Sequence, residues 1–263
     1  MLASLAIIES ARSSTSCVRH PTSITMRNPL GSTGWLLDRE SDGASRFIGS
    51  CFAFRRRNHL LTAAHCVRDI SGTLEVSYRT EAGISASSVA NVIVHPRADI
   101  ALIKLPETTA LDDMFAGDTN LYTWGIPVSA FGYPDDIGRS TTPPTPRYLR
   151  GNIQRMFRHC SHLRYEYEAA ELSFGAPSGL SGGPVTPNSD YSMAMGVVAE
   201  NLNVSRSLYS ISSTTTEVDR GGDIERVTVT EKAYSVIDYT VVVLLDPLTE
   251  WLDEHIPYPD ADV

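Results

Sequence analysis

The sequence has 263 residues, of which 42% are hydrophobic and 20% charged, and it carries a formal net charge of −9. This length and composition are those of a globular chain with a sizeable core. The acidic balance argues against a nucleic-acid partner, because such a partner needs a basic surface. No run of about 18 apolar residues occurs, so we expect neither a transmembrane helix nor a membrane partner.

The chain begins with a segment that we expect to be a tail, over residues 1–30. Its apolar stretch Leu2–Ile8 has no basic residue before it and ends at Glu9, which is unlike a secretory signal. The whole chain has four cysteines, too few for a disulfide scaffold of this size. We therefore expect a cytoplasmic protein, with secretion as the alternative.

Short apolar segments follow the tail and recur between turn residues, a pattern typical of an all-β sandwich or barrel. In the first half they are Gly34–Leu37, Phe47–Phe54, His59–Ala64, Leu74–Tyr78, Val89–Val94 and Asp99–Leu105. In the second half they are Val128–Tyr133, Ala194–Ala199, Arg226–Thr230 and Tyr239–Leu245.

One helix is expected, at the C-terminal end of the chain. Asp246 can cap it and Pro247 suits its first position. Helical spacing then places Leu248, Trp251, Leu252 and His255 on one face.

The segment GAPSGLSGGPV places Ser181 among three glycines, Gly179, Gly182 and Gly183. Glycines allow a backbone to turn sharply. Such a turn can aim the N–H groups of Gly179 and Ser181 at one point beside the serine hydroxyl, where an oxyanion forms when serine attacks a carbonyl. Ser181 is therefore a candidate nucleophile that needs a base and an acid from elsewhere in the chain.

His65 in LLTAAHCV is the candidate base, because the small Ala63 and Ala64 before it leave room around the imidazole. Asp99 in VHPRADIALIKL is the candidate acid, because it directly precedes an apolar strand and is expected to be partly buried. Taken singly, His65 also fits a core histidine, Asp99 a strand cap and Ser181 a turn residue.

Together, the segments TAAHC, DIALIKL and GLSGGPV resemble the three triad motifs of the chymotrypsin-fold, or trypsin-like, serine proteases, in that family's order of His, Asp and Ser. The resemblance implies two six-stranded antiparallel β-barrels with a catalytic cleft between them and a C-terminal helix. The first barrel would span residues 31–120, the second barrel with the helix 121–256, and a tail 257–263.

The resemblance also implies a serine endopeptidase that hydrolyses a protein or peptide substrate through an acyl-enzyme at Ser181, with narrow specificity or control by a protein partner. It implies no metal and no organic cofactor. The rival interpretation is a regulatory or binding module on a protease fold that is silent without a partner. His159, Cys160 and His162 can be interpreted either as a metal site or as part of a surface loop.

Several departures separate the chain from the animal enzymes that are made as zymogens. The patterns GYP, RGNI and SGLSGGPV resemble the bacterial glutamyl-endopeptidase-like and HtrA-like members instead. Leu180 stands where the zymogen enzymes have an aspartate, and we expect its burial to anchor the turn. Ala199 stands where they have a serine that holds the triad aspartate, so Asp99 needs another donor. Cys51 and Cys66 fall where the family often has a disulfide.

The specificity pocket is expected to accept an apolar or small side chain. Its predicted lining is Gly175, Ala176, Val198, Asn201 and Tyr239. A long insert after Asn201 carries four acidic residues: Glu217, Asp219, Asp223 and Glu225. The insert either folds over the pocket and makes it selective for basic residues, or is a solvated hairpin.

Overall fold

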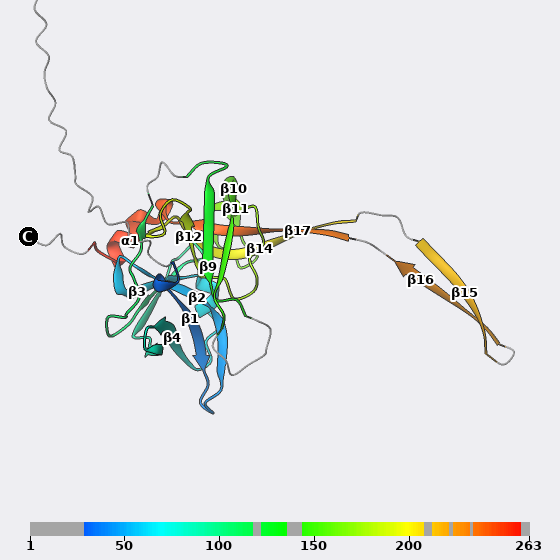
Figure 1. Ribbon diagram of the computed structural model, residues 1–263, viewed down its shortest axis with the longest axis horizontal. Helices are drawn as coiled ribbons and strands as arrows, with labels where there is room; N and C mark the ends of the chain where they lie inside the picture. Colours follow the sequence, from blue (N-terminus) through cyan, green and yellow to red (C-terminus); the bar gives the residue numbers. More distant parts are fainter. Residues whose placement is uncertain are drawn as a thin grey trace, which may run out of the picture.

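The first half of the chain forms one curled antiparallel sheet (Figure 1), in a computed structural model that describes residues 29–117, 122–135, 144–207, 212–220, 223–231 and 234–258. Its seven strands have the order β5-β4-β1-β2-β3-β7-β6. Their bounds are β1 Thr33–Arg39, β2 Ser45–Phe54, β3 Arg56–Thr62, β4 Thr73–Thr80, β5 Gly83–Ser88, β6 Asn91–Val94 and β7 Ala101–Lys104.

The second half forms a closed six-stranded barrel with the order β10-β11-β17-β14-β12-β9. Its strands are β9 Pro127–Gly132, β10 Arg147–Cys160, β11 Glu166–Leu172, β12 Pro184–Pro187, β14 Gly196–Ser207 and β17 Tyr234–Leu244. A short parallel pair joins β8, Phe115–Ala116, to β13, Met193–Ala194. The helical elements are η1 Pro29–Ser32, η2 Ala64–Val67, η4 Asp246–Leu248 and α1 Thr249–His255.

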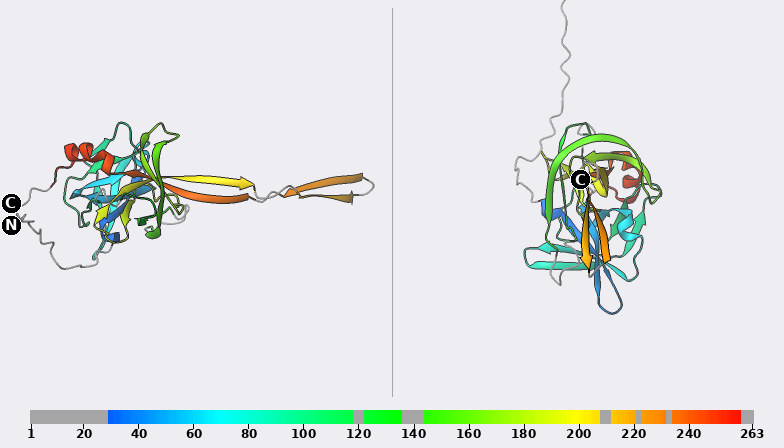
Figure 2. Two further views of the ribbon diagram at one scale, coloured as in Figure 1. Left: turned by 90° about the horizontal axis from the view of Figure 1, so that it is seen from above. Right: turned by 90° about the vertical axis from the view of Figure 1, so that its right-hand side faces the viewer.

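The all-β class with a C-terminal helix is confirmed, and so is the six-stranded second barrel. The first barrel differs in detail from the expected six strands, because it has seven and its end strands β5 and β6 do not pair with each other. The residues of β5 are mostly exposed, so this edge strand is solvated rather than buried in a closed ring. Figure 2 shows the sheet and the barrel from two further directions.

Strands β14 and β17 continue beyond the barrel as a two-stranded ribbon (Figure 1). Farther along the chain, β15 Ser212–Arg220 pairs with β16 Asp223–Glu231 as an antiparallel hairpin. Residues 212–220 and 223–231 of the acidic insert thus form a hairpin, and its solvation remains a prediction. The structure does not describe the side chains of the four acidic residues of this insert.

A shared apolar core holds the sheet against the barrel. Phe52 and Ile100 from the sheet pack in one cluster with Val197 and Val241 from the barrel, and Leu252 of α1 completes it. Each of these side chains is fully buried. The cluster fixes the relative placement of the two β structures, and with it the space between them.

The C-terminal helix buries the predicted face. Leu248 and Leu252 are buried, and the half-buried rings of Trp251 and His255 stack at 5.0 Å. The start differs from the prediction, because Asp246 opens the 3-10 turn η4 and the N-cap residues Leu245 and Leu248 make no side-chain capping hydrogen bond.

Two further expectations concern the chain as a whole. Most of the predicted N-terminal tail, residues 1–28, lies outside the described residues. In the part of the chain that the structure describes, no helix is both long and apolar enough to cross a bilayer.

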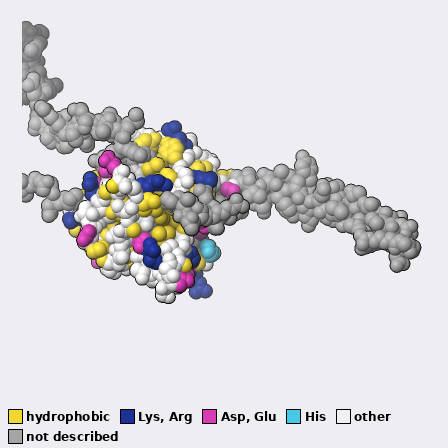
Figure 3. Space-filling model, turned by 60° about the horizontal axis from the view of Figure 1, so that its bottom comes forward, with side chains coloured by type: hydrophobic (Ala, Val, Ile, Leu, Met, Phe, Trp, Pro, Cys, Tyr) yellow, Lys and Arg dark blue, Asp and Glu magenta, His cyan; other side chains and the backbone are white. Residues whose placement is uncertain are grey.

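The face drawn in Figure 3 mixes acidic, basic and hydrophobic side chains.

A buried carboxylate ties β1 to the loop that precedes β4. Asp38 accepts hydrogen bonds from Arg46 at 2.9 Å, from the Ser71 N–H at 3.1 Å and from the Gly72 N–H at 2.8 Å. The hydrogen bond from Arg46, followed by that from Ser71, lowers the pKa of Asp38 from 3.8 to about 2. Because the folded-state pKa is depressed, the carboxylate stabilises the fold above its unfolded pKa and loses this effect as the pH falls through 2.

We predict that Asp38→Asn lowers the Tm at pH 7, because the amide cannot accept all of these hydrogen bonds. The Tm difference from the wild type should shrink between pH 4 and pH 2, as the wild-type carboxyl becomes protonated. Thermal unfolding followed by circular dichroism measures it, with the exposed Glu107→Gln as control. A Tm difference that does not change with pH would contradict the assignment.

Candidate active site

The candidate base and acid are in contact in the structure. Asp99 Oδ2 lies 2.7 Å from His65 Nδ1, and Asp99 Oδ1 accepts the His65 backbone N–H at 2.9 Å. Asp99 is buried and directly precedes β7, while His65 lies on η2 after β3. Because β3 and β7 are neighbouring strands, the two residues meet at one end of the sheet. The donor that Asp99 needs in place of a serine at position 199 is therefore the backbone of His65 itself.

Ser181 lies on the turn before β12, in a backbone that only glycine can follow at two positions. Gly179 has φ +85°, and a Cβ there would lie 2.4 Å from the Asp135 nitrogen. Gly182 has φ +87°, and a Cβ there would lie 2.0 Å from the Ser50 carbonyl oxygen. The glycines around Ser181 thus let the turn press against β2 and against the segment after β9.

Ser50 of β2 is the residue that fixes this turn. Its backbone N–H donates to the Ser181 carbonyl at 2.8 Å, and its hydroxyl donates to the Gly179 carbonyl at 2.9 Å. The same hydroxyl accepts the Tyr133 N–H at 2.8 Å. Thr62 donates to the Ser50 carbonyl at 2.8 Å. A single buried serine of the first sheet therefore joins β3, the nucleophile turn and the chain leaving β9.

The turn leaves two N–H groups available beside Ser181. The N–H groups of Leu180, Gly182 and Gly183 donate to backbone carbonyls. Those of Gly179 and Ser181 have no backbone acceptor among the described residues. These two were the predicted oxyanion donors, and their availability fits that role. Leu180 is fully buried, as expected of the residue that anchors the turn.

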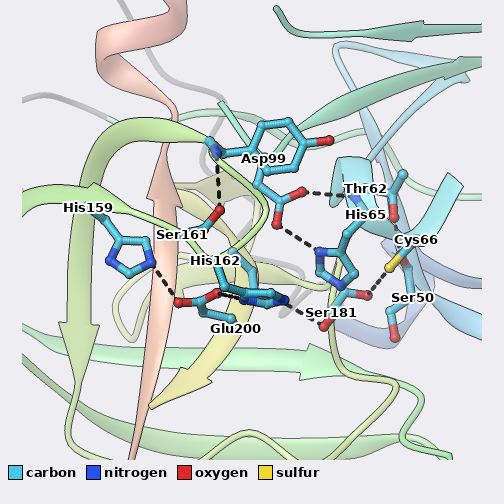
Figure 4. Close-up of polar contacts among 12 residues, drawn as sticks. Ser50, Thr62, His65, Cys66, Asp99, His159, Ser161, His162, Ser181 and Glu200 are labelled. Carbon is cyan, nitrogen blue, oxygen red and sulfur yellow. Dashed lines mark hydrogen bonds and ion pairs between the residues drawn. The ribbon is translucent and has the colours of Figure 1, made fainter. Parts of the chain in front are cut away.

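The Ser181 hydroxyl is hydrogen-bonded to the backbone in this structure. It donates to the Ala199 carbonyl at 3.3 Å, and no hydrogen bond joins it to His65 among the described residues. Ser181, His65 and Asp99 nevertheless line the same cavity (Figure 4). Hydrogen bonds between a nucleophile and its base often form fully only with substrate bound.

The environment of His65 favours its charged form. Burial is the largest single influence and lowers the pKa of the imidazole, but the hydrogen bond with the Asp99 carboxylate and the neighbouring Cys66 sulfur together outweigh it. The net result holds the pKa of His65 above its usual value of 6.5. The carboxylate therefore both orients the ring and stabilises the imidazolium that a general base becomes when it accepts a proton.

The cavity has a volume of about 380 Å³ and differs in part from the predicted pocket. Ala176, Val198 and Asn201 line it, whereas Gly175 and Tyr239 are not among its described lining residues. A Cβ at Gly175 would lie 2.5 Å from the Cβ of Asp238, so a carboxylate side chain packs where this glycine has none.

Two ionisable residues of the lining were missed by the sequence reasoning, namely Glu200 and His162. Glu200 is the charged residue within the apolar strand GVVAEN, and this was the signal that could have found it. His162 had been considered together with His159 and Cys160. No group of three or more His, Cys, Asp or Glu side chains in the described residues is arranged to hold a metal ion, and Cys160 is exposed.

A model of the trypsin-like peptidase domain matches residues 49–193, more than half of the chain and a range that includes His65, Asp99 and Ser181. The chain belongs to the trypsin-like peptidase family. A comparison with curated proteins gives no significant match.

Several solved peptidase structures share this fold at low sequence identity. The MamO protease domain from Magnetospirillum magneticum, in its apo form, is 14% identical with a TM-score of 0.59, covering 86% of this chain and 98% of that one. The HtrA-type protease AlgW with a decapeptide is 13% identical with a TM-score of 0.58, covering 86% and 65%. GrC is 16% identical with a TM-score of 0.57, covering 87% and 96%.

The cysteine pair beside the histidine of this trypsin-like peptidase consists of free thiols. Cys51 and Cys66 are both buried and unpaired. Burial raises the pKa of the Cys51 thiol far above its usual range, so this sulfur is unreactive. Cys66 Sγ lies 3.8 Å from the Ser181 carbonyl oxygen and packs against the nucleophile turn.

We predict that Ser50→Ala destabilises the protein by about 1–3 kcal/mol, because the half-buried Gly179 carbonyl and the buried Tyr133 N–H lose their shared partner. Urea unfolding measures the loss. The control is Ser88→Ala on the exposed edge strand β5, which should change stability by less than about 0.5 kcal/mol. Equal stability of the two variants would show that the hydroxyl does not hold the turn.

Proposed function

We propose that this trypsin-like peptidase is an active serine endopeptidase that uses His65, Asp99 and Ser181. The observation that carries the proposal is the 2.7 Å contact between His65 Nδ1 and Asp99 Oδ2 in a cavity that Ser181 also lines. The orienting acid and the base are already paired, and the nucleophile stands beside them with two N–H groups available for an oxyanion.

In the proposed reaction, Ser181 Oγ leaves the Ala199 carbonyl and forms a bond to the carbonyl carbon of the substrate, while His65 Nε2 accepts its proton. The N–H groups of Gly179 and Ser181 stabilise the oxyanion of the tetrahedral intermediate. His65 then gives the proton to the leaving amine, and the C–N bond breaks to leave an acyl-enzyme. Water hydrolyses the ester by the same steps in reverse, and Asp99 holds the ring throughout.

The substrate in this proposal is a protein or peptide. The cavity beside Ser181 continues along Ala199, Glu200 and Asn201 of β14, and an extended peptide can lie along such a strand. AlgW, which shares the fold, was solved with a decapeptide. This likeness supports peptide binding but names no sequence.

The rival function is a binding or regulatory module that needs a partner to become active. The observation that favours it is the hydrogen bond of the Ser181 hydroxyl to Ala199 instead of to His65. The two functions differ in whether the isolated protein reacts with a fluorophosphonate probe. An active peptidase is labelled alone, whereas the rival is labelled only with its partner present.

We predict that Ser181→Ala reduces peptide hydrolysis by about 10⁴-fold or more without loss of stability, because it removes only the attacking oxygen. A fluorophosphonate probe should label the wild type and not the variant. Alkylation of the thiols is the matched control and should leave most of the activity, since no cysteine takes part. Undiminished hydrolysis by Ser181→Ala would refute the mechanism.

The pH dependence gives a second test of the same site. Only neutral His65 accepts a proton, and Asp99 holds its pKa above 6.5, so kcat/KM should rise with pH to a midpoint above 6.5. Asp99→Asn should lower this midpoint and reduce kcat by about 10⁴-fold. An unchanged midpoint in the variant would show that another group controls the profile.

A further inference from the structure

The cavity beside Ser181 holds a second carboxylate–imidazole arrangement that the proposed mechanism does not use. Glu200 directly follows Ala199, the residue whose carbonyl accepts the Ser181 hydroxyl. Its carboxylate lies 2.6 Å from His159 Nε2 and 3.5 Å from His162 Nδ1. Figure 4 shows these three side chains next to the catalytic group, on the barrel side of the cavity.

The carboxylate is held firmly from its buried side. The His159 side chain is only 10% exposed and packs edge-on against the rings of Phe157 and Tyr167. Because these rings fix the imidazole, its short contact with Glu200 fixes one carboxylate oxygen. The second oxygen points toward His162, which is 77% exposed at the rim. A fixed, partly exposed carboxylate can therefore meet a ligand that enters from the cleft.

The cavity offers a carboxylate to a cationic ligand. Its described lining contains the carboxylates of Asp99 and Glu200, and it contains neither Lys nor Arg. The other ionisable groups of the lining are the imidazoles of His65 and His162. Apolar residues make up much of the remaining lining, and an ammonium or guanidinium group that enters it can pair with the Glu200 carboxylate.

We propose that Glu200 is a specificity residue that binds a cationic side chain, lysine or arginine, of the peptide next to the scissile bond. This inference rests on the proposed peptidase function. Asp99 already accepts two hydrogen bonds from His65, so Glu200 is the carboxylate of the lining that remains for the ligand. The pocket that the sequence suggested to be apolar is thereby selective for basic residues, through β14 itself rather than through the acidic insert.

The first experiment measures binding without catalysis. n-Butylammonium chloride serves as a probe for the lysine head group, butanol as its neutral counterpart, and the NMR signal of the His162 ring as the readout, assigned with His162→Gln. We expect butylammonium to bind about tenfold more tightly than butanol. Glu200→Gln, whose amide oxygen can still accept the His159 hydrogen bond, should abolish that difference. Glu168→Gln, on an exposed position of β11, should keep it.

The second experiment uses fluorogenic peptides that carry lysine or norleucine at each position on the acyl side of the cleaved bond. For the wild type, lysine at one position should raise kcat/KM by about tenfold or more, and Glu200→Gln should bring the ratio near one. Equal binding of butylammonium and butanol, or an unchanged lysine preference in Glu200→Gln, would overturn the proposal. If no peptide is cleaved and Ser181 is not labelled, the proposed function fails, while the butylammonium result still decides the role of Glu200.

Discussion

The position of the nucleophile depends on a hydrogen-bonded contact between the two β structures, centred on Ser50. This residue belongs to β2 of the first sheet, yet its N–H and its hydroxyl bind the carbonyls on either side of the nucleophile turn in the second barrel. The first sheet also positions His65 and Asp99. The same sheet therefore positions the base and the acid and restrains the backbone that carries the serine. The relative positions of His65, Asp99 and Ser181 thus all depend on the first sheet.

Glycine makes this contact sterically feasible. The backbone of Gly182 lies so close to the Ser50 carbonyl that a Cβ atom would clash with it. Gly179 has a left-handed backbone conformation. Leu180 adds the apolar part of the attachment, since it is buried among the barrel residues Val185 and Val198. Polar bonds on one side of the turn and apolar packing on the other hold it without an ion pair.

The sequence alone predicted those parts of the site whose signals are local. His65, Asp99 and Ser181 each stand in a short motif with an adjacent strand or turn, and the structure brings all three to one cavity. Glu200 and His162 were missed as lining residues because their proximity arises only when β10 and its following turn curl around the barrel toward β14. A short sequence motif cannot reveal the contact between His159 and Glu200, because these residues lie 41 positions apart in the chain.

The strands of the fold likewise differ in whether a local sequence pattern predicts them. The strands with long apolar runs were predicted, whereas the short buried strand β12 and the mixed strand β11 were not. The 14-residue strand β10 was also missed, because most of its residues are exposed or half-buried and several are arginines. The extra edge strand β5 was missed for a similar reason, since Ser and Gly dominate it. Such strands owe their conformation to the hydrogen bonds of a neighbour rather than to a buried face of their own.

The buried Arg55 at the end of β2 constrains the order in which the protein folds. Its guanidinium is almost inaccessible, and it binds the carbonyl of Ile256 and the carboxylate of Asp253, residues at the far end of the chain. Until these partners emerge from the ribosome, the first sheet contains a positive charge that cannot be buried without a counter-charge. The core around Arg55 is therefore complete only when the segment that carries Asp253 and Ile256 has docked against the first sheet.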